Sequence, residues 1–541
     1  MNTAEPPTTL RVFRENSRRY PDRPQLIYFD TILTVRQVDE LSDALAAALA
    51  AEGVGPGDRV AAFMQNMPHY VLTLLAVWKL GAILVPVNPM LRAAELEHHL
   101  NDCGAVVLVA LDTLWRDVAR DVVAATAVRR VITARGCGMQ TRNDERVLAD
   151  RTVEPATGVL EFETLLARYR GRAPRPHEPS PEDVAFLCYT SGTTGAPKGA
   201  MCSHRNVISV GRATCAVTAV GPHSTVLALA PLFHITGLMV QLVPALISCC
   251  PLVLSFRFHP GVMLDSIREH RPTFAVGPVT AYIGLLQNPG FTLSDFAAFD
   301  RVYSGGAPIS PATARSFEER TGQQLLGAYG MTEATAATHL TPKGMRSPVD
   351  PTTGALAVGL PTPGTSVRIV DDDGNELPAG TAGEVVLSSP GVVSGYWNRP
   401  DATAATIRDG LLYSGDIGVV DEDGWLFLVD RKKDLINCSG FKVWPREVED
   451  ALYEHPAVLE AAVVGAPDRY RGETVKAFVS LKKPGSVDSA ELAAFVRERL
   501  AAYKRPSEIQ ILGSLPKTSS GKILRRALRD STTSLPTAAL D

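Results

Sequence analysis

Cysteine is scarce in this chain, and its spacing argues against two kinds of site. The eight cysteines are scattered, and no C-x-x-C pair occurs among them. We therefore expect neither a disulfide framework nor a zinc site, and we expect a reducing, cytoplasmic environment. Residues 1–18 lack the apolar stretch of a signal peptide, so no secretory leader is expected.

A strong excess of either charge is also missing. Lysine and arginine number 54 against 58 acidic residues, a net charge of −4. This balance gives no electrostatic argument for binding nucleic acid or an anionic membrane. The sequence leaves peripheral membrane contact and a homodimer open, and it favours small-molecule partners.

Residues 213–256 contain no Asp, Glu, Lys or Arg. A membrane-spanning helix needs about 20 consecutive apolar residues, whereas Gly221-Pro222, Pro231, Pro244 and Pro251 interrupt this stretch. We expect a buried strand–helix–strand segment, with a membrane-associated segment as the alternative. A segment of this kind would also suit the wall of an apolar ligand tunnel.

The 541 residues exceed what one compact core accommodates. Thr34 and Gln37 form a capping box that should start a helix ending at Gly53. Strands are then predicted at 59–64, 83–87 and 105–110, with helices at 70–80 and 93–100. Strands that alternate with helices indicate a parallel sheet covered on its faces.

The rest of the chain divides into regions that differ in their predicted pattern of helices and strands. We predict an α/β fold with a large N-terminal lobe (1–430) and a small, mobile α+β C-terminal lobe (435–530). The large lobe would contain two βα subdomains with parallel sheets (1–180 and 181–354) and a small β subdomain (355–430). Residues 135–180 are predicted as a surface connection, 431–434 as a hinge and 531–541 as a tail.

The string Tyr189-Thr190-Ser191-Gly192-Thr193-Thr194-Gly195-Ala196-Pro197-Lys198-Gly199 follows an apolar run that predicts a buried strand. Its glycines permit a tight turn, while its hydroxyls and lysine could cradle a polyphosphate. The spacing is not that of a Walker A loop. A flexible surface loop is the alternative for such a composition.

This string resembles the phosphate-binding loop of the adenylate-forming superfamily, which includes acyl-CoA synthetases, luciferases and peptide-synthetase adenylation domains. Further segments match that superfamily in order over nearly the full chain, and they are most similar to fatty acyl-CoA synthetases. The resemblance implies an ATP site that includes Thr190, Ser191, Gly192, Thr193, Thr194, Gly195 and Lys198.

Four more segments carry the nucleotide side of the resemblance. They imply that Gly305, Gly306 and Ala307 line the adenine and the acyl pocket, and that Ala328, Tyr329, Gly330 and Thr332 contact the nucleotide. Glu333 would bind Mg²⁺, because a carboxylate is a hard oxygen ligand. Asp416 would accept the ribose hydroxyls, and Arg431 would donate near the ribose or phosphate. Lys522 would bridge the attacking carboxylate and the α-phosphate, with Thr190, His234 and Glu333 as the other catalytic residues.

The acyl side of the resemblance rests on Phe233-His234. His234 would gate the passage between ATP and the acyl group, with Leu238, Gly305 and Gly330 as acyl-binding neighbours. Peptide-synthetase domains have Phe-Asp here, so an amino-acid substrate is not expected. Some long-chain enzymes have a gating Trp where this chain has Leu238, which puts tunnel gating in doubt.

The C-terminal segments imply a coenzyme A site at Ser439, Gly440, Lys442, Trp444 and Arg471, with Lys433 as the hinge residue. The expected reaction is ATP- and Mg²⁺-dependent conversion of a medium- or long-chain fatty acid to acyl-AMP, followed by transfer to CoA. A ligase for aromatic or alicyclic acids is the alternative. A luciferase-type oxygenase stays open, and so does a regulatory nucleotide-binding protein, although Glu333, Asp416, Arg431 and Lys522 argue against the latter.

Overall fold

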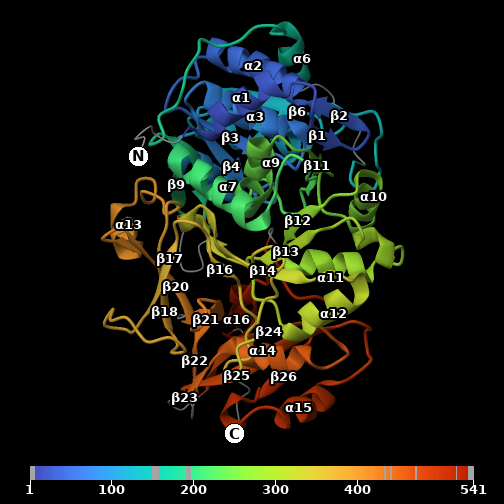
Figure 1. The fold of residues 1–541 in the computed structure, drawn as a ribbon, viewed down its shortest axis with the longest axis vertical. Helices are drawn as coiled ribbons and strands as arrows, with labels where there is room; N and C mark the ends of the chain where they lie inside the picture. The colour runs from blue at the N-terminus through green and yellow to red at the C-terminus, as the bar shows by residue number, and fades with distance from the viewer. Residues whose placement is uncertain are drawn as a thin grey trace.

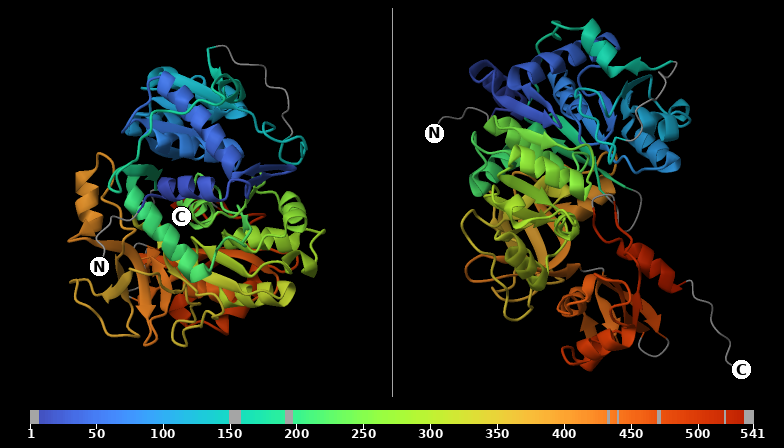
Figure 2. Two further views of the ribbon diagram at one scale, coloured as in Figure 1. Left: turned by 45° about the horizontal axis from the view of Figure 1, so that its top comes forward. Right: turned by 90° about the vertical axis from the view of Figure 1, so that its right-hand side faces the viewer.

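The computed structural model describes residues 7–148, 158–190, 197–431, 434–438, 441–468, 472–518 and 521–533. A large lobe extends to residue 431, and a small lobe begins at residue 434. The right-hand view of Figure 2 shows the small lobe, in orange and red, projecting below the large one. Within the described ranges, no helix combines the length and apolarity needed to cross a membrane.

A seven-stranded sheet forms the upper part of the large lobe (Figure 1), in the order β7-β6-β5-β3-β4-β8-β9. All its pairs are parallel except β8 with β9. The strands are β3 (Arg59–Phe63), β4 (Ile83–Val87), β5 (Val107–Leu111), β6 (Arg130–Ala134), β7 (Leu160–Glu161), β8 (Val184–Tyr189) and β9 (Gly199–Ser203).

The helices around this sheet follow the predicted alternation. The capping box of Thr34 and Gln37 is present at the start of α2 (Val35–Ala51). Every residue of α3 (Pro68–Lys79) is buried, because it lies between the sheet and α2. The remaining helices here are α1 (Thr9–Arg19), α4 (Ala93–Cys103), α5 (Asp112–Leu114) and α6 (Phe162–Arg168), with helical turns at Trp115–Ala119 and Val123–Ala125.

Residues 135–180 were predicted as a surface connection, but their described part also contributes to the core. Within them, α6 buries Phe162, Leu165 and Leu166 in the same core as α2. The helix has only 7 residues, which is too short for a clear helical period.

A nine-stranded sheet has the order β16-β15-β14-β13-β12-β10-β11-β1-β2. Its centre is parallel, and β2, β15 and β16 add antiparallel edges. The strands are β1 (Pro24–Tyr28), β2 (Thr31–Thr34), β10 (Val226–Leu227), β11 (Leu252–Leu254), β12 (Phe274–Gly277), β13 (Arg301–Gly305), β14 (Leu325–Met331), β15 (Ala336–Leu340) and β16 (Leu360–Pro361). The helices beside it are α10 (Pro260–His270), α11 (Val279–Gln287) and α12 (Pro311–Thr321), with turns at Leu293–Phe296 and Thr332–Ala334.

The two sheets exchange strands across the predicted division at residue 180. β1 pairs with β11 in the second sheet, whereas β8 and β9 complete the first. The phosphate-loop hairpin therefore arises from one sheet, and the glycine loop after β13 and the Thr332-Glu333 turn arise from the other. A nucleotide site formed by all three must lie between the sheets.

Most of the charge-free segment is buried, as expected, although Ala216, Ala219, Pro222 and His223 are exposed. It continues from α7 (His204–Thr218) through β10 to the short helix α8 (Ile235–Gly237), a π-helical turn (Leu238–Leu242), α9 (Val243–Ser248) and β11. Side chains from both sheets and this segment form a single core cluster. Polar links fix it further, since the Gln25 amide donates to the carbonyls of Ala245 and Cys250.

A small sheet ends the large lobe, in the order β17-β18-β20-β19 with β21 beside β20. Its elements are β17 (Ser366–Val370), β18 (Gly383–Ser388), α13 (Pro400–Thr406), β19 (Ile407–Arg408), β20 (Leu411–Val420) and β21 (Leu426–Arg431). The small lobe has its own sheet, β23-β22-β25-β24 with β26 beside β25. Its elements are β22 (Ile436–Cys438), β23 (Phe441–Val443), α14 (Pro445–Tyr453), β24 (Val458–Asp468), β25 (Gly472–Leu481), α15 (Ser489–Arg497), the turn Ala502–Lys504, β26 (Glu508–Ile511) and α16 (Arg525–Thr533).

Candidate active site

Several of the predicted nucleotide residues lie where β13, β14, β20 and β21 meet. β13 and β14 are parallel neighbours, so their carboxyl ends present Gly305 and Met331 at one edge of the sheet. The turn Thr332–Ala334 follows directly. From the adjoining β subdomain, Asp416 on β20 and Arg431 on β21 lie opposite each other in register.

The Asp416 carboxylate is held in place from two sides. The Tyr329 hydroxyl donates to its Oδ2 at 2.9 Å, and the Arg431 Nε lies 3.2 Å from its Oδ1. Burial, followed by the charge of Asp416, raises the pKa of Tyr329, so this hydroxyl remains a donor. Each carboxylate oxygen accepts more than one hydrogen bond, so Asp416 can still receive two ribose hydroxyls.

Glu333 is oriented by a residue that the sequence analysis did not single out. The hydroxyl of Tyr396 donates to Glu333 Oε1 at 2.6 Å. The Lys198 ammonium lies over the ring of the same tyrosine, 4.4 Å from the ring centroid. Tyr396 therefore links the predicted metal ligand to the predicted phosphate-binding lysine.

A single fixed carboxylate fits the way proteins bind Mg²⁺ together with a nucleotide. Mg²⁺ is usually held by one or two carboxylates and by substrate phosphates, with water in the remaining positions. Glu333 would supply that carboxylate, and Lys198 and Arg431 would supply positive charge for the phosphates. The donor set around Glu333 therefore suits a Mg·ATP complex.

The described ends of the phosphate loop are joined. The Thr190 amide donates to the Lys198 carbonyl at 2.9 Å, and the Trp397 amide donates to the Gly199 carbonyl at 2.8 Å. Residues 395–397 thus pair with the strand that leaves the loop. The predicted residues Ser191, Gly192, Thr193, Thr194 and Gly195 lie outside the described residues, and their phosphate contacts stay predictions.

Lys522 comes from the small lobe and reaches this group. Its Cε lies 2.8 Å from where a Cβ on Gly306 would stand, and Gly306 has a left-handed φ of +81° that favours glycine. The next residue back is anchored as well, because the Thr280 hydroxyl donates to the Gly521 carbonyl at 3.2 Å. Burial and then the charge of Arg431 lower the pKa of Lys522 to about 8, while Asp416 and Glu333 act in the opposite direction.

His234 lies beside Lys522 at the start of α8. Its Nδ1 accepts the Thr236 amide at 3.2 Å. Burial and then the charge of Lys522 lower its pKa to about 3, so the ring is neutral at any ordinary working pH. Gly237 lets this turn close, because a Cβ there would stand 2.1 Å from the Pro231 carbonyl oxygen. A neutral imidazole can border an apolar group without the cost of a buried charge.

The other acyl-side residues have mainly a packing role in this structure. Leu238 is fully buried one turn beyond His234. A Cβ on Gly305 would stand 2.8 Å from the Ala328 carbonyl oxygen, and one on Gly330 would stand 1.6 Å from that of Ala336. These glycines allow the strands at the site to approach closely. Their contact with an acyl chain stays a prediction.

The structure describes two of the predicted CoA residues, Lys442 and Trp444. Lys442 is exposed on β23, while Trp444 packs against Ile417, Val419 and Val429 of the large lobe. Ser439, Gly440 and Arg471, and the predicted hinge residue Lys433, lie outside the described ranges. These roles stay predictions.

Comparisons with known proteins point to one family. The family model described as AMP-binding enzyme matches residues 13–397, and the model of its C-terminal domain matches residues 447–522. A long-chain-fatty-acid–CoA ligase of Bacillus subtilis (strain 168) is 36% identical, covering 97% of this chain and 95% of the relative. The protein of the same description from Escherichia coli O6:H1 is 38% identical, covering 96% and 93%.

Solved structures extend the comparison to aromatic acids. The crystal structure of an anthranilate CoA ligase, in complex with anthranoyl-AMP, superposes with a TM-score of 0.87 at 27% identity. The match covers 97% of each chain. The overall arrangement described above is therefore shared with a protein that has been observed with an acyl-adenylate.

Proposed function

The chain belongs to the family of AMP-binding enzymes, and we propose that it converts a medium- or long-chain fatty acid to its CoA thioester in two half-reactions. The observation that carries this proposal is the position of Lys522. Its side chain crosses from the small lobe to Gly306, next to Asp416, Glu333 and Arg431. An ammonium group held there faces the site at which a carboxylate and a nucleotide phosphate would meet.

In the first half-reaction, a carboxylate oxygen of the acid attacks the α-phosphorus of ATP. An oxygen–phosphorus bond forms, the bond from the α-phosphorus to the bridging oxygen breaks, and pyrophosphate leaves. Lys522 would lower the repulsion between the two anions and stabilise charge that grows on the transferring phosphoryl group. Glu333 would hold Mg²⁺, which supplies further charge neutralisation when bound.

In the second half-reaction, the sulfur of CoA attacks the acyl carbonyl carbon. A carbon–sulfur bond forms, the carbon–oxygen bond to AMP breaks, and the thiol proton passes to solvent. Lys522 has no task in this step, so the small lobe can present a different face, turning about Lys433. Selective loss of acyl-AMP formation in a Lys522→Ala variant would support this division.

The choice of a fatty acid rests on two observations. The relatives from Bacillus subtilis and Escherichia coli are described as long-chain-fatty-acid–CoA ligases, and the segment beyond His234 is charge-free and buried. Each methylene buried in such surroundings contributes about 0.8 kcal/mol. An aromatic or alicyclic acid is the second candidate, and the likeness to the anthranilate CoA ligase favours it.

One assay separates the two candidates. Pyrophosphate release is measured with ATP and Mg²⁺ over saturated acids from about C4 to C18 and over several aryl acids, with and without CoA. A CoA-dependent maximum among the aliphatic acids supports the proposal. If pyrophosphate is released only with aryl acids, the substrate is an aromatic acid rather than a fatty acid, and the proposed mechanism is unchanged.

We also propose that the reaction takes place in the cytoplasm. All eight cysteines are free thiols, and six of them are buried. A reducing compartment preserves such thiols. ATP and CoA are the co-substrates that the proposed reaction requires there.

A further inference from the structure

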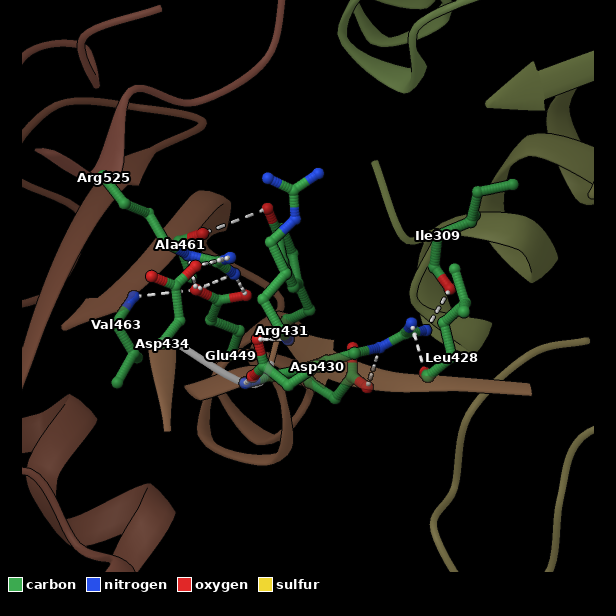
Figure 3. A network of polar contacts seen from close by, with 12 residues as sticks. Ile309, Leu428, Asp430, Arg431, Asp434, Glu449, Ala461, Val463 and Arg525 are labelled. Carbon is green, nitrogen blue, oxygen red and sulfur yellow. Dashed lines mark hydrogen bonds and ion pairs between the residues drawn. The ribbon is translucent and has the colours of Figure 1, made fainter. Parts of the chain in front are cut away.

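The guanidinium of Arg446 lies between the two lobes. Arg446 is in the first turn of α14 and is 4% exposed. Its Nη2 donates to the Ile309 carbonyl at 3.1 Å, and its Nη1 donates to the Leu428 carbonyl at 3.0 Å. Its own amide donates to Asp430 Oδ2 at 2.9 Å. One residue of the small lobe thus bonds three residues of the large lobe. Figure 3 shows Ile309 and Leu428 close together at the right, with Asp430 nearer the centre.

The acceptor Ile309 belongs to the loop that Lys522 contacts. Gly305 and Gly306 begin that loop, and Ile309 anchors its far end in the core of the large lobe. The small lobe therefore contacts this loop at two points, through Lys522 at Gly306 and through Arg446 at Ile309. Together, the two contacts define the distance and the angle at which Lys522 approaches the nucleotide site.

Inside the small lobe, α14 is tied to the segment that carries Lys522. Glu449, on α14, receives two hydrogen bonds from Arg525 Nη2 at 2.7 and 2.6 Å, and its Oε1 also accepts the Val463 amide at 2.8 Å. Arg525 follows Lys522 closely in the chain. Asp434, at the start of the lobe, lies 3.1 Å from Arg529 and 3.8 Å from Arg525. Asp434, Glu449, Val463 and Arg525 form a group in Figure 3.

These links make Arg446 and Lys522 parts of one rigid unit. A bidentate pair between an arginine and a carboxylate has a fixed geometry, so a change in how Arg446 docks is transmitted through Glu449 and Arg525 to the Lys522 segment. A guanidinium can bond two carbonyls in different directions at once, whereas a lysine ammonium acts as a point charge.

We propose that Arg446 is a positioning residue for the first half-reaction, which holds the small lobe in the orientation that brings Lys522 to the nucleotide site. This inference rests on the proposed function and deepens it. Arg446 does not touch the reacting groups. Its bonds belong to this docked orientation and would break when the lobe turns, so the second half-reaction should not need them.

The test compares Arg446→Met, which keeps an aliphatic stem, with Arg446→Lys. The matched control is Arg499→Met, because Arg499 pairs with Glu454 on the same lobe and bonds to the Phe495 carbonyl. Single-turnover acyl-AMP formation and thioester formation from supplied acyl-AMP are measured separately. We expect Arg446→Met to slow the first about tenfold or more, equivalent to about 1.4 kcal/mol, and to change the second less than about twofold. The rate of acyl-AMP formation of Arg446→Lys should lie between those of Arg446→Met and the parent chain. Arg499→Met should have the same rate as the parent chain.

A second measurement needs no substrate. Hydrogen–deuterium exchange of the peptide covering residues 303–311 should become faster in Arg446→Met and stay unchanged in Arg499→Met. Parallel loss of both half-reactions, an unchanged first half-reaction, or unchanged exchange in this peptide would overturn the proposal. If the parent chain activates no acid, the proposed function fails, and the exchange result still decides whether Arg446 holds the lobe.

Discussion

The pKa of Lys522 is lowered to about 8 by burial and by the charge of Arg431. The charged form is the one that can stabilise the transferring phosphoryl group. For the free enzyme, kcat/KM of acyl-AMP formation should therefore fall as the pH rises through about 8. Bound triphosphate favours the ammonium form, so kcat should fall at a higher pH than kcat/KM. A pH profile of pyrophosphate release checks both statements.

Two controls belong to this experiment. Lys522→Ala should lower acyl-AMP formation by about 100- to 1,000-fold, while Lys483→Ala, which changes an exposed lysine of the small lobe, should leave it unchanged. A kcat/KM that stays level to pH 9.5 in the parent chain would contradict the assignment of the titrating group to Lys522.

Tyr396 bonds to Glu333 Oε1 at 2.6 Å while its ring carries Lys198. Tyr396→Phe keeps the ring and removes the hydroxyl, so we expect weaker Mg²⁺ binding with the Lys198 contact retained. Loss of a group that orients a metal ligand typically lowers metal affinity by about 10- to 100-fold. Calorimetric titration of Mg·ATP into the protein measures this change.

The matched variant is Tyr20→Phe. Tyr20 contacts Arg19 and Arg23 through its ring, so loss of its hydroxyl should leave Mg·ATP binding unchanged. Equal affinities for the Tyr396→Phe variant and the parent chain would show that Tyr396 does not orient Glu333 for the metal.

The nucleotide roles were assigned because each residue lies in a short motif that resembles one of the superfamily, and these roles stay predictions. Glu333, Asp416, Arg431 and Lys522 are of this kind, and the structure brings them together. Tyr396 and Arg446 could not be found in the same way. Tyr396 and its partner Glu333 are 63 residues apart in the chain, and Arg446 and its partner Ile309 are 137 residues apart. No local sequence pattern indicates contacts over such separations.

The turn at α8 depends on Gly237. A Cβ there would stand 2.1 Å from the backbone oxygen of Pro231, which cannot move without moving the segment that carries His234. We expect Gly237→Ala to destabilise the fold by about 1–3 kcal/mol and to slow acyl-AMP formation. Thermal unfolding and the pyrophosphate assay measure the two effects.

Gly221 provides the comparison within the same charge-free segment. No atom lies within 4 Å of a Cβ built there, so Gly221→Ala should change stability by less than about 0.5 kcal/mol. If the two variants have the same stability, close packing at Gly237 is not what shapes the turn.

Elements with strong local signals were predicted well. The capping box placed the start of α2 correctly, and β4 has the predicted bounds 83–87. α6 was missed because it is short, and the sheet to which β1 belongs was missed because its partner β11 lies far along the chain. Periodicity reports which face of an element is buried, and it does not report against which partner.

The small lobe buries its own hydrophobic cluster, which includes Val443, Val448, Leu452, Val463 and Val479. A fragment of residues 431–541 should therefore fold alone and unfold cooperatively. Circular dichroism with thermal melting checks this. A shorter fragment that starts at residue 458 lacks β22, β23 and α14 and should remain unfolded.

Neither lobe alone should form acyl-AMP, because Lys522 and the nucleotide residues would then be on separate molecules. Mixing the two fragments, 1–433 and 434–541, which keeps Arg431 on the large lobe, should restore part of the activity in proportion to their concentration. A fragment 1–433 that is fully active by itself would remove Lys522 from the mechanism.

The pairing of β1 with β11 also affects how the protein is made. Leu26 pairs with Leu252, which is synthesised roughly 225 residues later. At synthesis rates of about 5–20 residues per second, this delay is about 10 to 45 seconds. During that time β1 can pair with β2, but the edge that later joins β11 has no partner. A chaperone that binds the nascent chain early should therefore raise the yield of native protein more than one that acts after release.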